Sequence, residues 1–337
     1  MRKKSDIILN IAMIAVIVIL PLFFCRNMVS AERSTVAAGG SFPGVSTDEV
    51  HFAIQPSAAF IPLYVAKEKG WLDEAMAQYG VSVYWHSFDS GPPINESLLN
   101  RQSDIGVLGD VPTVFAIALG QDNVITATAA QAADSYAVLV PADSDITSAS
   151  QLKGKRFATV IGTTAHNLMS KYLASGGLSF SDVHLVNIAA ADTADTLRNH
   201  KADAAAIWEP SVTRLTDSGV ARVLGKGSDC GLAGTNTLVA RRVFAENNPT
   251  LIKVINEQYK RGAQALSEGL DDDTLSKIAA YMSLDNSQVM SLVPYFVYSV
   301  DITQEDIDSL NDTIDFLFEV DQIPEKYDIS DYIFIAE

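Results

Sequence analysis

The sequence predicts an α/β fold built as two lobes, and three observations carry this prediction. Of the 337 residues, 48% are hydrophobic and 19% are charged, a composition typical of globular proteins with core enough for two lobes. Short apolar strands alternate with helices from residue 49 to residue 240. From about residue 244 onward the pattern becomes mostly helical. We therefore expect two lobes with mainly parallel sheets, joined by two strand-like crossings, with a helical tail returning to the first lobe.

Residues 1–31 predict an export signal, either a signal peptide or an N-terminal membrane anchor. Three basic residues at 2–4 precede an almost entirely apolar run at 7–24, which is long for a signal core and near the minimum for a membrane span. Small residues at 29–31 offer a cleavage site, and Cys25 raises the alternative of a lipoprotein. The large apolar residues just before Cys25 disfavour lipidation. We expect an exported protein, in the periplasm or on the outer face of the cytoplasmic membrane, with residues 32–48 as a flexible tether.

Cysteine content and charge exclude several classes of protein. Beyond the leader the only cysteine is Cys230, so the mature part has no internal disulfide and no zinc site built on thiolates. The formal charge is −17, and from Asp271 to the C-terminus sixteen Asp and Glu stand against Lys277 and Lys326 alone. Nucleic acid and anionic membrane surfaces are therefore poor partners.

Residues 49–133 and 241–337 are predicted to form lobe 1. Apolar residues recur at helical spacing in 60–79 and most clearly in 111–119, whereas short apolar runs bounded by polar turns predict strands. In chain order we expect strand 50–54, helix 60–79, strand 81–85, helix 94–100, strand 104–108, helix 111–119 and strand 124–127. The tail adds helices at about 250–266, 273–282, 287–293 and 303–318.

Residues 134–240 are predicted to form lobe 2, which repeats the logic of lobe 1. We expect strand 136–140, strand 156–160, helix 165–175, strand 184–187, helix 194–200 and strand 204–208, before strand 236–240 leads back to lobe 1. Ligands of open α/β sheets bind beyond the carboxyl ends of the strands, and interfaces between domains are preferred pocket positions. The sequence therefore predicts a ligand cleft between the lobes.

Three strand-to-helix turns of small polar residues are the main functional signal. They are Ser90-Gly91 and Gly109-Asp110 in lobe 1 and Thr163-Thr164 in lobe 2. In the first two turns a proline follows within the first helical turn, where its missing N–H costs nothing. The first amides of a helix lack partners and the helix dipole favours negative charge there, so each turn is a possible anion site. Thr163 or Thr164 can also cap its helix. Together the three turns predict a clamp on one anionic head.

Two carboxylates near these turns leave the charge of the ligand open. Asp110 is either a cap of its own helix or a group that faces the cleft. Glu209, at the rim where strand 204–208 ends, is able to meet a cationic group. If both carboxylates converge on a pocket that also holds anion donors, the site suits a zwitterion such as an amino-sulfonate.

Four further residues complete the candidate ligand site. Trp208 either packs in the core or forms a wall of the pocket. Gln55 and Ser57, in the turn after the first strand, are either neutral hydrogen-bond donors or ordinary turn residues. His166 either packs at a helix start or contacts the ligand.

Catalytic, metal and cofactor signals are missing from the sequence. The five histidines show no metal-ligand spacing, and no nucleophile elbow, phosphate loop or dinucleotide fingerprint occurs. We therefore expect a protein that is not an enzyme and that holds no cofactor and no metal.

Seven motifs in order give the chain a family resemblance. They are Ala66-Lys67-Glu68-Lys69-Gly70-Trp71-Leu72, Ser90-Gly91-Pro92-Pro93, Asp104-Ile105-Gly106-Val107-Leu108-Gly109-Asp110, Asp134-Ser135-Tyr136-Ala137-Val138-Leu139-Val140-Pro141, Leu152-Lys153-Gly154-Lys155-Arg156, Gly162-Thr163-Thr164-Ala165-His166-Asn167-Leu168 and Ile207-Trp208-Glu209-Pro210. With these motifs the chain resembles the substrate-binding proteins of ABC importers for aliphatic sulfonates, taurine and nitrate, a group that includes thiamine-pyrimidine synthase relatives. The resemblance covers about residues 50–245.

The resemblance implies a periplasmic-binding fold of class II, with two crossovers, that closes on its ligand and delivers it to a membrane permease and its ATPase. It also implies that the cleft is lined by Ser90, Gly91, Gly109, Asp110, Thr163, Thr164, His166 and Trp208. Glu209 stands where relatives often carry Asp, and its side chain is one methylene longer. We expect a monomer that binds a small organic anion or zwitterion, with an aliphatic sulfonate or taurine first.

Several alternatives stay open at this point. The same fold also serves nitrate, bicarbonate, amino acids and thiamine-precursor pyrimidines. An enzyme of the thiamine-pyrimidine synthase or menaquinone-pathway type is disfavoured, because those enzymes are cytosolic and the synthases use a Cys-rich motif that Cys230 alone cannot supply. A third possibility, a membrane-tethered sensor ectodomain, stays open if the leader is not cleaved.

Overall fold

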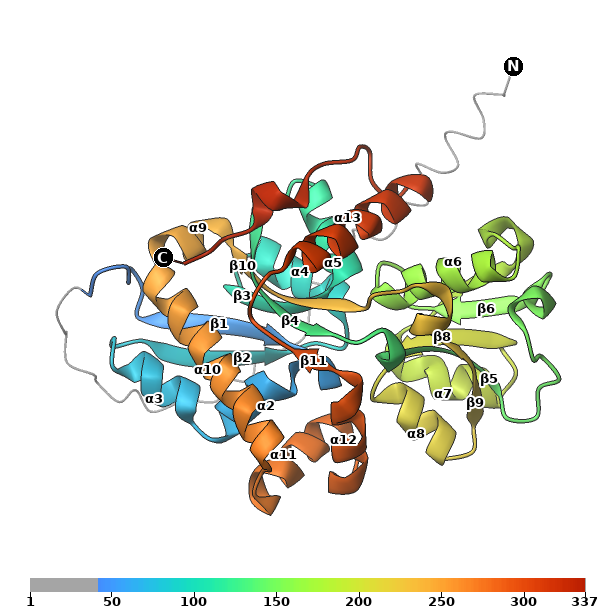
Figure 1. The fold of residues 1–337 in the computed structure, drawn as a ribbon, viewed down its shortest axis with the longest axis horizontal. Helices are drawn as coiled ribbons and strands as arrows, with labels where there is room; N and C mark the ends of the chain where they lie inside the picture. Colours follow the sequence, from blue (N-terminus) through green and yellow to red (C-terminus); the bar gives the residue numbers. More distant parts are fainter. Residues whose placement is uncertain (1–41, 337) are drawn as a thin grey trace, which may run out of the picture. The chain divides into compact units, whose positions relative to one another are not determined.

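The computed structural model describes residues 42–336, whose strands form two β-sheets (Figure 1). The predicted export signal and most of the predicted tether lie outside the described residues. Within the described residues, no helix combines the length and the apolar character needed to cross a membrane.

The first sheet has six strands, and we call the part built on it lobe 1. Its strand order is β11 (Val297–Tyr298), β4 (Asn123–Gln131), β10 (Thr235–Arg241), β3 (Ile105–Gly109), β1 (Glu49–Ile54) and β2 (Ser82–Ser87). The central strand β3 reads Ile-Gly-Val-Leu-Gly and is buried throughout, whereas the edge strand β2 alternates between exposed and half-buried positions. This contrast in burial follows from the place of each strand in the sheet, because a central strand is covered on both faces.

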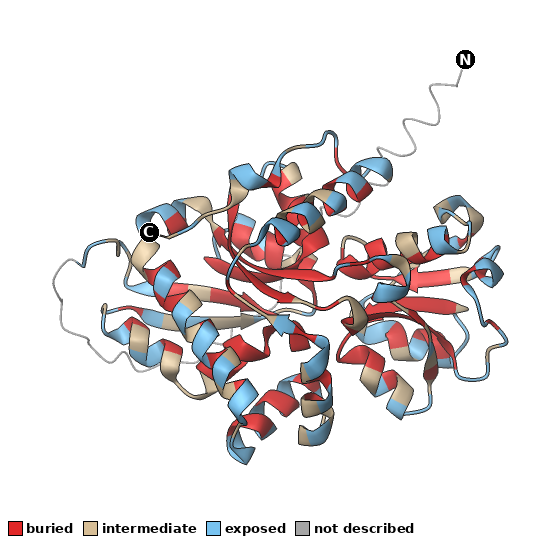
Figure 2. Ribbon diagram, in the orientation of Figure 1, coloured by how far each residue is buried: buried red, intermediate tan, exposed pale blue. Residues whose placement is uncertain are grey.

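The second sheet has five strands and forms the basis of lobe 2. Its order is β7 (His184–Asn187), β6 (Arg156–Thr159), β8 (Ala204–Trp208), β5 (Tyr136–Pro141) and β9 (Ala221–Lys226). The alanine-rich β8 and the valine-rich β5 are buried along their whole length, and Figure 2 shows the inner strands of both sheets in the buried colour.

The prediction of mainly parallel sheets is wrong. Strand β1 pairs in parallel with β2 and β3, and β6 with β7 and β8, but β10 is antiparallel to β3 and β4, and β5 is antiparallel to β8 and β9. The two strands β5 and β10 each enter a sheet directly from the other lobe. A strand that arrives by such a crossing, without an intervening helical crossover, runs against its neighbours.

The crossings between the lobes run side by side. Residues 132–135 lead from β4 to β5, and residues 227–234 lead from β9 back to β10. The Ala132 amide donates to the Gly234 carbonyl at 3.2 Å. Gly234 has a φ of +69°, and a Cβ there would lie 2.7 Å from the Ala132 carbonyl oxygen, so only glycine fits this close approach. The two crossings predicted from the sequence are confirmed.

Helices surround both sheets. In lobe 1 they are α2 (Ile61–Glu68), α3 (Trp71–Ala77), α4 (Gly91–Leu99) and α5 (Asp110–Ala118), and in lobe 2 they are α6 (Thr164–Ser175), α7 (Thr193–Arg198) and α8 (Ser211–Asp217). The tail consists of α9 (Arg242–Asn247), α10 (Pro249–Glu268), α11 (Asp272–Met282), α12 (Asn286–Leu292) and α13 (Gln304–Glu319). The short 3-10 helices are Ala58–Phe60, Ala133–Ser135, Ala149–Leu152, Phe180–Asp182, Ala190–Asp192, Gly227–Cys230, Val293–Tyr295 and Ile329–Tyr332.

Four expectations about individual elements are corrected. The predicted helix 60–79 is two helices, because Gly70 adopts a left-handed φ of 70° between α2 and α3. Helix α8, strand β9 and the two-residue strand β11 are additional elements. The predicted helix 194–200 ends at Arg198, and His200 has a positive φ of 49°. Strand β4 extends well beyond the predicted 124–127.

The tail helix α13 packs on α5 through a buried apolar cluster. Apolar residues of α5, including Val111 and Val114, form a buried cluster with Leu310, Ile314 and Leu317 of α13. Figure 1 shows α13 beside α5 although the two helices are far apart in the chain. The apolar stripe predicted on 111–119 therefore packs largely against the tail.

Candidate functional site

The first turns of α4, α5 and α6 meet at one small cavity between the lobes. Gly91, Gly109, Thr163 and Thr164 line this space, which has a volume of about 20 Å³ and is called the inner cavity below. The N-cap residues Ser90, Gly109 and Thr163 all have extended backbones; Gly109 has no side chain to cap α5, and neither Ser90 nor Thr163 caps its helix. The prediction that a threonine caps the helix of lobe 2 is therefore wrong. Thr163 Oγ1 instead donates to the Val160 carbonyl at 2.7 Å.

Side-chain caps occur on three helices of the tail, whereas α2, α3, α7, α8, α9 and α10 lack them as the helices at the cavity do. In the tail, Asp271, Asp285 and Thr303 each accept a hydrogen bond from the first turn of α11, α12 and α13. An uncapped helix start leaves amide donors for water or a ligand, although Pro92 and Pro93 supply none in the first turn of α4. The inner cavity thus collects helix N-termini from both lobes, an arrangement that favours an anion.

Glycine is required where these helix starts approach one another. A Cβ on Gly91 would lie 2.6 Å from Pro112 Cγ, so the N-termini of α4 and α5 are in contact. A Cβ on Gly109 would collide with the Thr164 hydroxyl of lobe 2. Both glycines therefore leave room for a side chain of a neighbouring helix at the cavity.

Neutral side chains complete the inner cavity. Besides the helix starts, it is lined by Gln55, Ser57, Phe60, Pro112, Tyr136, Trp208 and Asn236. Gln55 Nε2 already donates to the Val107 carbonyl at 2.9 Å, and Tyr136 Oη donates to Asn236 at 3.1 Å. Trp208 also lines the cavity, and its indole N–H makes no hydrogen bond to another described residue. No carboxylate, ammonium, guanidinium or imidazole belongs to this lining among the described residues.

Four of the lining residues were not anticipated from the sequence: Phe60, Pro112, Tyr136 and Asn236. The sequence contained a usable signal for two of these residues, Tyr136 and Asn236. Tyr136 begins β5 and Asn236 lies near the start of β10, so both stand where the chain crosses between lobes. Residues at such crossings necessarily lie near the base of the cleft.

Asp110 lies behind the inner cavity rather than in its lining. It is 2% exposed, and its carboxylate accepts hydrogen bonds from the hydroxyls of Thr164 and Thr313 and from the Val111 amide. Burial raises the pKa of Asp110, and these hydrogen bonds oppose the rise. Thr164 belongs to lobe 2 and Thr313 to α13, so Asp110 joins three separate parts of the molecule. Its role as a ligand contact stays a prediction.

The Glu209 carboxylate also forms its hydrogen bonds within this chain. Its buried carboxylate accepts from the Thr213 amide at 3.0 Å and from Thr213 Oγ1 at 3.1 Å, in the first turn of α8. Burial raises its pKa. Its peptide bond to Pro210 is cis. Glu209 does not line the inner cavity, and the sequence analysis could not anticipate this partner because it did not predict α8.

His166 is packed between aromatic rings rather than turned into the inner cavity. Its ring centroid lies 5.1 Å from that of Phe180 in lobe 2 and 5.9 Å from that of Phe316 in α13. The side chain is buried, and its Nδ1 atom has no hydrogen-bond partner among the described residues. Burial lowers the pKa of His166 to about 4.

This environment makes stability depend on pH. The folded protein keeps His166 neutral down to about pH 4, whereas the unfolded chain binds the proton near pH 6.5. Stability from this residue is therefore complete above about pH 6.5 and is lost as the pH falls toward 4. Between about pH 7 and pH 4, we expect the unfolding free energy of the wild type to fall by up to about 3 kcal/mol more than that of His166→Gln. Urea unfolding of both proteins across this range measures the difference, and parallel curves would contradict the expectation.

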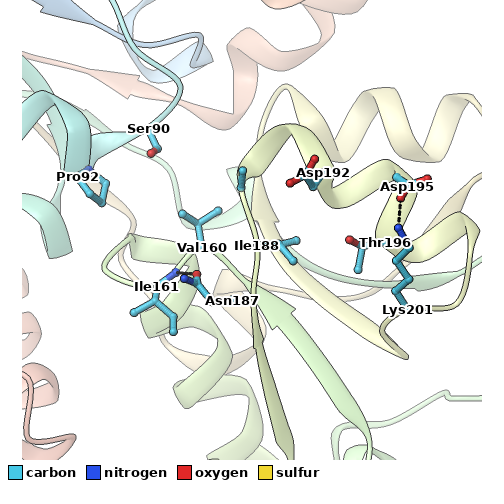
Figure 3. Close-up of a pocket in the computed structure, with 11 residues that line it drawn as sticks. Ser90, Pro92, Val160, Ile161, Asn187, Ile188, Asp192, Asp195, Thr196 and Lys201 are labelled. Carbon is cyan, nitrogen blue, oxygen red and sulfur yellow. Dashed lines mark hydrogen bonds and ion pairs between the residues drawn. The ribbon is translucent and has the colours of Figure 1, made fainter. Parts of the chain in front are cut away.

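A larger cavity opens beside the inner one, and Ser90 lies in it. This outer cavity has a volume of about 600 Å³ (Figure 3). It is lined by Ser90, Pro92, Val160, Ile161, Asn187, Ile188, Ala189, Asp192, Asp195, Thr196 and Lys201. Ser90 is followed in the chain by Gly91 of the inner cavity, so the two cavities flank one turn. The structure describes no group of three or more His, Cys, Asp or Glu able to hold a metal ion within residues 42–336.

Comparisons with known proteins agree with this geometry. The chain is 29% identical over 300 residues to a Bacillus subtilis (strain 168) protein named for binding aliphatic sulfonates, covering 88% of this chain and 89% of that protein. It is 26% identical to the taurine-binding periplasmic protein of Escherichia coli (strain K12), covering 91% of this chain and 98% of the relative.

A solved structure shows the same fold. The alkanesulfonate-binding protein SsuA from Xanthomonas axonopodis pv. citri, bound to MOPS, superposes with a TM-score of 0.79 at 25% identity. The match covers 87% of this chain and all of that chain. The two-lobe α/β fold expected from the sequence is confirmed, and the structural match is to a binding protein. The family model described as NMT1/THI5 like matches residues 57–269. This chain therefore belongs to the NMT1/THI5-like family.

Proposed function

We propose that this protein is the extracytoplasmic solute-binding component of an ABC importer and that it captures an aliphatic sulfonate or taurine. The observation that carries the proposal is the inner cavity, where the N-termini of α4 and α5 from lobe 1 and of α6 from lobe 2 meet without a carboxylate in the lining. A sulfonate is a compact anion with three acceptor oxygens. Amide donors and a helix dipole stabilise such a group without any charged side chain.

Binding in this proposal is coupled to closure of the lobes. A ligand in the inner cavity contacts α4 and α5 of lobe 1 and α6 of lobe 2 at once. These contacts coexist only when the lobes are closed, so the ligand shifts the population toward the closed state. The closed form then presents the ligand to a permease and its ATPase. The protein would act without chemistry of its own, as an exported monomer divided into lobe 1 (49–133 and 241–337) and lobe 2 (134–240).

A thermal-unfolding panel tests this function. We expect methanesulfonate, ethanesulfonate or taurine to stabilise the protein by about 2.7 kcal/mol at a concentration of about 100 times the Kd. Nitrate, bicarbonate, an amino acid and a thiamine-precursor pyrimidine should give smaller shifts. Stabilisation by one of these four, with none from any sulfonate, would overturn the substrate class while leaving the fold intact.

A further inference from the structure

Two histidine side chains contact each other at the edge of the first sheet. His51 lies on β1 and His86 on the edge strand β2, and His51 Nδ1 is 3.0 Å from His86 Nε2. The two strands are parallel and His51 stands opposite Tyr84, so His86 lies two positions further along the same face. The histidines are 35 positions apart in the chain, and only the pairing of β1 with β2 brings them together.

Solvent reaches this histidine pair. The His51 side chain is 30% exposed, His86 is half-buried, and the ring of Tyr84, which stacks on His51, is 43% exposed. On the opposite face of the same two strands, Phe52 and Trp85 stack on each other against the hydrophobic core. Side chains alternate between the faces of a strand, so the two imidazoles point away from this core. A solute is therefore able to reach their ring nitrogens.

The charges around the histidine pair favour a cation. Glu49 Oε2 lies 3.5 Å from His51 Nε2, the ring nitrogen that faces away from His86. Asp104 accepts a hydrogen bond from the His51 amide at 3.0 Å and forms an ion pair with Arg241. Two carboxylates and one guanidinium thus surround the two rings, which leaves a net negative charge while both imidazoles are neutral. Burial and the neighbouring His51 ring lower the pKa of His86, whereas Asp104 opposes this change.

The distance between the two ring nitrogens fits a shared metal ion. Imidazole nitrogen suits Cu²⁺, Ni²⁺ and Zn²⁺, and it binds Zn²⁺ at about 2.0–2.1 Å. Two such bonds at an angle of about 90–110° hold their nitrogens about 2.9–3.4 Å apart, a range that includes the observed 3.0 Å. Coordination would replace the hydrogen bond between the rings, and its proton would move to His86 Nδ1 through solvent. Glu49 beside His51 Nε2 favours the proton on that nitrogen, which leaves His51 Nδ1 free to coordinate.

We propose that His51 and His86 form a two-histidine surface site for a divalent cation of the Cu²⁺, Ni²⁺ and Zn²⁺ class, with water in the remaining coordination positions. Neither histidine lines the inner cavity, so this inference stands apart from the proposed function. It also differs from a site with three or more protein ligands, which residues 42–336 do not provide. A bound ion links the edge strand β2 to β1 and stabilises the folded chain, because the unfolded chain does not hold the two rings together.

Calorimetric titration with each metal ion alone tests the site on the wild-type protein. At about pH 7.5, where ordinary imidazoles are neutral, we expect one Ni²⁺ to bind at the pair, Cu²⁺ to bind more tightly, and Mg²⁺ to bind much more weakly than either. At about pH 5.5 protons compete for the ring nitrogens, and Ni²⁺ binding should weaken about tenfold or more. Equal affinities for Mg²⁺ and Ni²⁺, or a Ni²⁺ affinity that does not change with pH, would overturn the proposal.

Histidine variants locate the bound ion. His51→Ala and His86→Ala should each weaken Ni²⁺ binding about tenfold or more, because one imidazole cannot chelate. Glu49→Gln keeps both ligands and should weaken Ni²⁺ by a smaller factor. The matched controls are His184→Ala and His200→Ala, which remove exposed histidines of lobe 2 and should leave the Kd unchanged.

Thermal unfolding supplies a second measurement. Ni²⁺ should raise the unfolding midpoint of the wild type and of both control variants, but not that of the double variant His51→Ala/His86→Ala. This comparison holds even if the substitutions themselves lower stability, since each protein is measured with and without the metal. Equal Ni²⁺ affinity or equal stabilisation in the wild type and the double variant would place the bound ion elsewhere and refute the site.

Discussion

Replacing Asp110 with alanine should weaken ligand binding by about tenfold to a hundredfold. Asp110 in lobe 1 accepts a hydrogen bond from Thr164 in lobe 2, so part of its bonding exists only when the lobes are closed. A hydrogen bond to a charged group contributes about 1.5–3 kcal/mol. Its loss would make closure of the lobes, and therefore ligand binding, less favourable by about that amount. Titration calorimetry of the variant with a sulfonate that binds the wild type measures the change in Kd.

Two controls separate this closure role from direct contact with the ligand. Thr313→Val removes the 2.9 Å bond from α13 to Asp110 together with the 3.2 Å contact of the same hydroxyl with the Ser309 carbonyl inside α13, and it should lower stability while changing the Kd little. Taurine and ethanesulfonate differ by a terminal amine, and loss of a closure contact should weaken both equally. A loss confined to taurine would instead mean that Asp110 meets the amine. An unchanged Kd for both ligands would contradict any role of Asp110 in binding.

Gly91→Ala is expected to reduce both stability and affinity. The added Cβ would lie 2.6 Å from Pro112 Cγ and 2.7 Å from Pro112 Cβ, well inside van der Waals contact. The N-termini of α4 and α5 must then separate, which costs about 1–3 kcal/mol as overpacking and moves the amides that line the inner cavity. We expect a tenfold or greater rise in the sulfonate Kd, because positions in such a site matter at the level of about 0.5 Å.

The double variant Gly91→Ala/Pro112→Ala provides the internal control. It removes Pro112 Cγ, the nearest atom, and keeps Cβ, so part of the clash is relieved. Affinity and the midpoint of urea unfolding should recover in part, which a double-mutant cycle expresses as a coupling between neighbours. Additive losses in the double variant would show that Gly91 acts by another route than its contact with Pro112.

Local sequence patterns predicted most helices and strands, because the spacing of apolar residues reflects which side chains each element buries. The continuous apolar run of β3 and the alternation of strands with helices set the α/β class. The predictions were wrong at one glycine that interrupts a helix and at features set by distant parts of the chain. A single glycine in a left-handed conformation separates α2 from α3, and the direction of β5 and β10 follows from the path of the chain between lobes. Helix α8 follows Glu209-Pro210 and is short, so it presented little helical periodicity.

The same division applies to the candidate site. The sequence by itself located the candidate site at three helix starts, because small residues there allow a ligand or a neighbouring helix to come close. Only the tertiary structure decided the orientation of Asp110, Glu209 and His166. Asp110 meets Thr313, which is 203 positions further along the chain, and His166 meets Phe316 of the same distant helix. A side chain turns toward the partner that packing brings to it, and no local sequence pattern specifies a partner so distant in the chain.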